Sequence, residues 1–227
     1  MNLAALAVLA LLAWAYLLSG AGMAGMPGMG ASPRFATNVL MWLVMMVAMM
    51  VPAASPTILL YAHVHRHSNG VEPRPPTAAF LAGYLACWSG FALAAAGLQS
   101  WFIPPSSMAL ASRHAAAGLF VVAGIYQLTP FKYACLSRCR SPARFLSRHY
   151  RTGAIGAFRM GMLHGAYCVG CCWLLMALLF VGGVMNLVWI AGLTLLVAAE
   201  KLLPGGFWLA RIAGIAMIAW GAALLFG

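Results

Sequence analysis

Long apolar runs, separated by short polar stretches, dominate the sequence. An α-helix needs about 20 mostly apolar residues to cross the hydrocarbon core of a bilayer. The pattern therefore predicts an all-α, polytopic membrane bundle of seven transmembrane helices, forming a single domain over residues 1–227. The expected spans lie near residues 2–19, 36–61, 77–102, 108–128, 158–181, 185–202 and 206–226.

The composition excludes a soluble domain and several kinds of chemistry. Hydrophobic residues make up 64% of the chain and charged residues 7%, whereas soluble domains are about 45–50% apolar and about 25% charged. Glu72 and Glu200 are the only acidic residues, so paired-carboxylate catalysis and carboxylate-rich Ca²⁺ or Mg²⁺ sites are excluded. No Walker or nucleophile-elbow motif is present. The sequence favours a protein that is not an enzyme.

The net charge of +11 comes from basic residues that lie between the apolar runs. This distribution indicates retention of basic loops in the cytoplasm rather than nucleic-acid binding. With seven spans it predicts a cytoplasmic N-terminus, an outer C-terminus and a multi-pass location in a bacterial inner membrane. The basic segment 130–156 is too polar to span, and we expect it to lie at the cytoplasmic headgroups, attracted by anionic lipid.

Two features predict how the helices pack. Pro52 and Pro56 lie inside the second apolar run, where they should kink the helix and free carbonyl groups that need other partners. The third run carries a small residue at every fourth position: Ala82, Ala86, Gly90 and Ala94. Such a stripe is typical of closely packed helices in lipid, so we expect it to face a neighbour.

Soft metal-ligating side chains are concentrated in the fifth apolar run. With Cys171 adjoining, one helical face carries a residue of this kind at every fourth position: Met160, His164, Cys168, Cys172 and Met176. Thiols with an imidazole suit Cu(I) or, as a second choice, Zn²⁺. Metal binding is the favoured interpretation; a thiol redox pair at Cys168 and Cys171, or plain packing, are the alternatives.

Methionines form two further groups. Met41, Met45 and Met49, with Met46 and Met50 beside them, place thioethers one turn apart in the second apolar run. An outer loop carries a methionine at every third position: Met23, Met26 and Met29. Thioethers are neutral ligands that suit Cu(I). Both groups are copper candidates, against the alternatives of core packing and an apolar connector.

Secondary candidates lie near the expected cytoplasmic side. Cys135 and Cys139 would stand one turn apart on a helix and receive or release a soft metal. His63, His65 and His67 alternate, and a solvated loop is the favoured interpretation. An extended metal clamp, which this spacing suits better than a helical face does, is the alternative.

The acid of the sixth apolar run is a separate candidate. Glu200 adjoins Lys201, so a local ion pair is expected, with proton coupling by Glu200 as the alternative.

Several strings resemble one bacterial family of unknown function, described as predicted metal-binding integral membrane proteins. They are residues 41–52, 83–88, 126–142, 161–173, 185–189 and 200–201. The resemblance covers roughly residues 38–202, and its most specific motif is Cys168-Val-Gly-Cys-Cys-Trp173. It implies metal binding and a membrane location, without an established reaction. The methionine spacing of the second run is also similar to that of high-affinity copper importers.

Together these features predict a membrane protein that handles Cu(I), by transport or by delivery to a partner. A non-catalytic subunit or scaffold of a larger complex is one alternative, and a membrane thiol–disulfide oxidoreductase is another. Expected partners are anionic lipid at the cytoplasmic face and a protein partner or larger membrane complex, but no nucleic acid.

Overall fold

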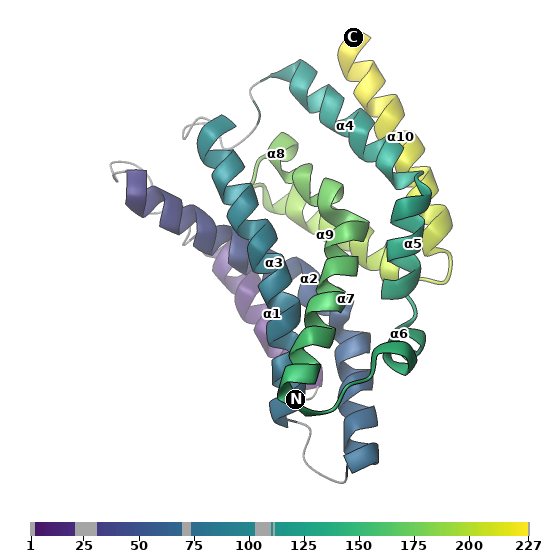
Figure 1. Ribbon diagram of the computed structural model, residues 1–227. Helices are drawn as coiled ribbons and strands as arrows, with labels where there is room; N and C mark the ends of the chain where they lie inside the picture. The colour runs from purple at the N-terminus through teal and green to yellow at the C-terminus, as the bar shows by residue number, and fades with distance from the viewer. Residues whose placement is uncertain (1–2, 21–30, 70–73, 103–109, 111, 227) are drawn as a thin grey trace.

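The computed structural model describes residues 3–20, 31–69, 74–102, 110 and 112–226, and within them the protein is all-helical. The helices are α1 Leu3–Leu18, α2 Ala31–Asn69, α3 Arg74–Phe102, α4 Arg113–Gln127, α5 Pro130–Cys139, α6 Pro142–His149, α7 Gly153–Ala177, α8 Leu179–Gly182, α9 Leu187–Leu202 and α10 Gly206–Phe226 (Figure 1). The expected all-α class is confirmed.

The predicted number of seven spans is not confirmed by the described residues. Among the described residues, four segments are long and apolar enough to cross a membrane: Phe35–His67, Pro76–Trp101, Gly153–Gly182 and Gly206–Phe226. α4 and α5 make a fifth if the pair, bent by 67°, is counted as one span. α1 and α9 have 16 residues each, which is about 24 Å of helix against a core of about 30 Å. Several long apolar helices are nevertheless compatible with a membrane protein.

The centre of the fold is the packing of α3 on α7, with α2 beside them (Figure 1). A Cβ atom at Gly83 would collide with the Phe158 carbonyl, and one at Gly161 with the Phe80 carbonyl. The two backbones therefore touch at these glycines. The expected small-residue stripe does not make this contact, because Ala82, Ala86, Gly90 and Ala94 are exposed. A period of four defines a face but does not say which neighbour it meets.

α2 continues through both of its prolines. Pro56 has no N–H to donate to the Pro52 carbonyl, and the Ser55 hydroxyl donates to that carbonyl instead, at 2.8 Å. The expectation that a freed carbonyl finds another partner is confirmed here.

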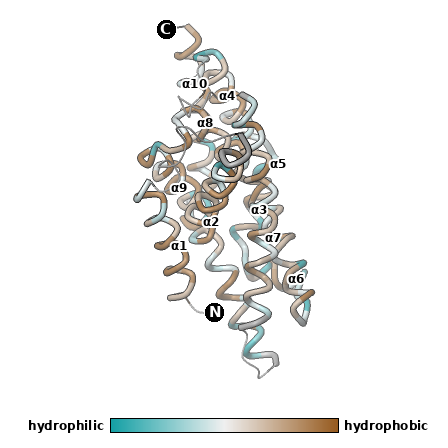
Figure 2. Tube along the Cα trace, turned by 90° about the vertical axis from the view of Figure 1, so that its left-hand side faces the viewer, coloured by the Kyte–Doolittle hydropathy of each residue, from teal (hydrophilic) through white to brown (hydrophobic). Residues whose placement is uncertain are grey.

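The basic segment was expected to lie peripherally, but its first helix belongs to the core. α5 packs on α7, and its Lys132 is buried and bound to Glu200 of α9. α6 is amphipathic: Phe145 and Leu146 are buried, whereas Arg144 and Arg148 are exposed. Figure 2 shows hydrophilic residues near α6 and the adjoining ends of α2 and α3, and hydrophobic ones along α1, α9 and α10.

Candidate metal centre

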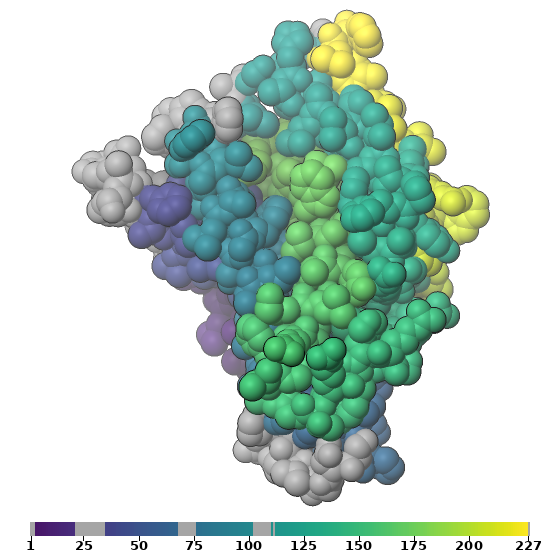
Figure 3. Space-filling model, in the orientation of Figure 1, coloured from purple at the N-terminus to yellow at the C-terminus, as the bar shows by residue number. Residues whose placement is uncertain are grey.

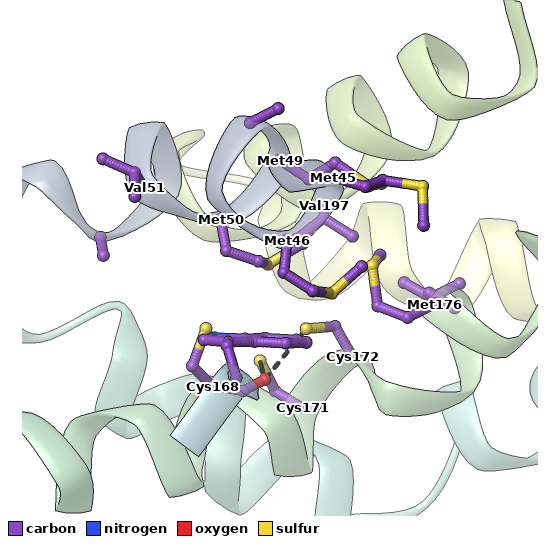
Figure 4. Close-up of a cluster of buried hydrophobic side chains, with 14 of the residues drawn as sticks. Met45, Met46, Met49, Met50, Val51, Cys168, Cys171, Cys172, Met176 and Val197 are labelled. Atoms are coloured by element: carbon purple, nitrogen blue, oxygen red, sulfur yellow. Dashed lines mark hydrogen bonds between the residues drawn. The ribbon is translucent and has the colours of Figure 1, made fainter. Parts of the chain in front are cut away.

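Three sulfur atoms from two helices converge on one buried amino group. The Lys201 Nζ of α9 lies 2.9 Å from the Cys168 Sγ, 3.8 Å from the Cys172 Sγ and 4.0 Å from the Met50 Sδ. We call Met50, Cys168 and Cys172 the sulfur site. In Figure 4 the methionines of α2 lie on one side of this site and the cysteines of α7 on the other.

The sulfur site is closed to the outside. Cys168 is 2% exposed, and Cys172 and Met50 are at least as deeply buried. The thiols of Cys171 and Cys172 both donate to the Cys168 carbonyl, at 3.1 and 2.9 Å, because residues three and four positions apart lie over the same turn. The cysteine-bearing face of α7 therefore faces protein, and hydrogen bonds to the helix backbone fix the thiols of Cys171 and Cys172.

The electrostatics of the site depend on Lys201, which is 6% exposed. Glu200, the sole carboxylate among the residues described here, binds Lys132 at 2.6 Å and the Gln127 amide at 2.8 Å. The expected local pair of Glu200 with Lys201 is therefore wrong, since consecutive residues on a helix do not face each other. The Lys201 ammonium instead donates to Cys168, whose sulfur also lies 3.0 Å from the Tyr84 hydroxyl.

The predicted ligand set of His164 with Cys168 and Cys172 is not assembled. No three His, Cys, Asp or Glu side chains in the described ranges are placed to hold one metal ion. His164 is buried among the rings of Phe80, Tyr84 and Phe145, and its Nδ1 has no hydrogen-bond partner.

The third donor beside the two cysteines is the thioether of Met50, a residue that the methionine spacing includes but does not single out. The sequence does show that Met46 and Met50 also stand one turn apart, on the face of α2 next to that of Met41, Met45 and Met49. In Figure 4, Met46 and Met50 both extend from α2 toward the cysteines of α7.

The remaining methionine candidates divide into three groups. Met41, Met45 and Met49 are fully buried on α2, and Met176 is buried on α7 near the sulfur site (Figure 4). Met160 is also buried, but its sulfur accepts the Arg151 backbone N–H at 3.2 Å. Met23, Met26 and Met29 lie outside the described residues.

The second cysteine pair, Cys135 and Cys139, lies on α5. Because α5 packs on α7, a Cβ at Gly170 would lie 3.0 Å from the Cys135 sulfur. Cys139, one turn further along α5, is partly buried against the core. All six cysteines are free thiols, and five of them lie along this one interface.

The histidine clamp is contradicted. His63, His65 and His67 belong to α2, and helical geometry points alternate residues in different directions. His63 and His67 are exposed, whereas His65 is buried beside the rings of Tyr61 and Tyr150.

These features define an all-helical protein with several helices long enough to span a membrane and a buried set of soft sulfur donors. A family model described as PpoB2, copper chaperone, matches residues 39–224, and the chain belongs to this family. The membership is consistent with the metal-binding family that the sequence resembles and indicates a copper-related function. No curated protein and no solved structure matches the chain.

Proposed function

We propose that the protein binds Cu(I) as cargo at the sulfur site of Met50, Cys168 and Cys172, and delivers it to a partner protein. The observation that carries the proposal is the convergence of two thiols and one thioether within 4.0 Å of a single buried cation. Thiolate and thioether sulfur are the ligands that select Cu(I). The copper chaperone family supports the same cargo, with Zn²⁺ as the second choice.

Lys201 balances the charge of this site. Two thiolates and one Cu(I) ion carry a net charge of −1, and the ammonium group of Lys201 brings the assembly to zero. A neutral assembly matters because an uncompensated charge in a buried, apolar setting is costly. Since the ammonium group now lies against all three sulfur atoms, it must move aside when the ion enters.

Further sulfur ligands extend from the site in two directions. The buried Met41, Met45 and Met49 continue along α2 toward its beginning, and the outer methionines Met23, Met26 and Met29 precede that helix. On the other side, Cys139 stands on the last turn of α5, the helix that packs on α7. We infer that methionines collect the ion and that α5 is the exit. The excess of basic residues in alternate loops supports a location in a bacterial inner membrane with a cytoplasmic N-terminus.

Copper content of the purified full-length protein tests the proposal. After incubation with Cu(I) and removal of unbound metal, we expect about one copper per wild-type chain, and a loss of stoichiometric copper in C168S/C172S and in M50L. Two matched controls should keep it: C87S, a cysteine outside the site, and M162L, a methionine of α7 that is 43% exposed.

Two results would contradict this function. Retained copper in C168S/C172S would reject the site assignment. A wild-type chain that binds no copper would favour the alternative of a scaffold, or of a thiol–disulfide oxidoreductase if Cys168 and Cys171 were found oxidised in isolated membranes.

A further inference from the structure

A second polar site lies away from the sulfur site, where α5 meets α6. The two short helices enclose a cavity of about 240 Å³. Six polar side chains line it: Arg138, Arg144, Arg148, Ser137, Ser141 and His149. Figure 3 shows α5 and α6 uncovered on the right-hand face of the molecule.

The three arginines of this cavity have no carboxylate to pair with in the described part of the chain, because Glu200 is bound to Lys132. Arg144 and Arg148 stand one turn apart on α6, and Arg138 comes from the last turn of α5. The Arg138 guanidinium is held over the Tyr167 ring, 4.6 Å from its centroid. Three like charges around one cavity repel each other, and an anion would remove that cost.

A serine hydroxyl of the cavity also suits an oxyanion. Ser141 stands at the N-cap of α6 without a side-chain capping bond, so its hydroxyl is not used by the helix. Guanidinium groups bind phosphate through paired N–H donors, which makes arginine the preferred residue for phosphate recognition.

The surroundings indicate where the phosphate group comes from. Phe145 and Leu146 anchor α6 against the helical core. Exposed apolar side chains flank the pair of helices along the chain: Phe131 is 62% exposed on α5 and Ile155 is 74% exposed on α7. A basic cavity, on a helix that also carries an exposed apolar side chain, in a chain of long apolar helices, matches a lipid, whose phosphate is charged and whose chains are not.

We infer that the cavity between α5 and α6 binds the phosphate group of an anionic phospholipid, through Arg138, Arg144 and Arg148. The site is separate from copper binding and does not depend on it. It gives the basic segment one defined lipid position instead of a diffuse attraction to a charged surface.

The test compares two triple variants with equal loss of charge. R138Q/R144Q/R148Q removes the cavity arginines, and R113Q/R151Q/R159Q removes three exposed arginines outside the cavity. Each purified full-length protein is titrated with phosphatidylglycerol in detergent, and bound lipid is counted by native mass spectrometry. We expect at least about tenfold weaker binding for the cavity variant and a change within about twofold for the other.

Equal weakening in both variants would overturn the inference, because it would show attraction by net charge alone. Displacement of the lipid by inorganic phosphate would also overturn it, by assigning the site to a soluble anion. Copper content is measured on the same samples. It should stay unchanged in both variants, so failure of the lipid site and failure of the sulfur site can be told apart.

Discussion

The buried ion pair between Lys132 and Glu200 allows a quantitative prediction about stability. Both side chains are at most 2% exposed, and their charged atoms lie 2.6 Å apart. Lys132→Met removes the ammonium and leaves the Glu200 carboxylate buried with only the Gln127 amide as partner. Breaking one side of a buried pair costs about 3–5 kcal/mol. At about 2–4 °C per kcal/mol for a chain of this size, the unfolding midpoint should fall by about 6–20 °C.

Thermal unfolding in one detergent, followed by circular dichroism, measures this effect. K132M/E200Q is the informative partner variant, because the amide that replaces the Glu200 carboxylate would still accept from Gln127 but would carry no charge; we expect it to recover at least half of the loss. R211M removes an exposed cation of α10 and should shift stability by less than about 1 kcal/mol. The reasoning is refuted if K132M melts like the wild type, or if the double variant is no more stable than K132M.

Three further outcomes follow from the packing and from the sulfur site. Gly161→Ala should lower the free energy of unfolding by about 1–3 kcal/mol or more, because the new methyl group meets the Phe80 carbonyl. Gly90→Ala is the control, because a Cβ there has nothing within 4 Å; its free energy of unfolding should stay within about 1 kcal/mol of the wild-type value. Lys201→Met should weaken Cu(I) binding at least about tenfold in competition with a Cu(I) chelator, because the bis-thiolate complex loses its counter-charge; unchanged affinity would reject the charge balance. A membrane-permeant maleimide should modify the half-buried Cys87 well before the buried Cys172 in the copper-free protein, as read by mass spectrometry; the reverse order would mean that the site opens to the outside.

Periodicity predicted the features that depend on one helix at a time. The last apolar run and α10 have the same bounds, 206–226. The sulfur-bearing face of α7 is buried as a face, since Cys168, Cys172 and Met176 all turn inward. These results follow from spacing, because the residues of one stripe share one environment.

Features that join distant segments cannot be predicted from spacing. Lys132 and Glu200 are 68 positions apart, and no local pattern says that one lysine serves a carboxylate and the other a pair of thiols. Met50 belongs to the site because the fold places this part of α2 opposite the cysteines of α7 (Figure 4), and the spacing of the methionines does not show this. Hydropathy marks apolar runs, but it does not show that α4 and α9 have only 15 and 16 residues, or that α4 and α5 are bent by 67° against each other.

The last turn of α9 connects two parts of the molecule through neighbouring residues. Lys201 holds the sulfur atoms of α2 and α7, while Glu200 holds α4 and α5, and Arg140 donates to the Glu200 carbonyl and to Leu203 just beyond. A movement of Lys201 therefore acts on the last turn of α9, which Lys132 and Arg140 hold to α5 and to the residue that follows it.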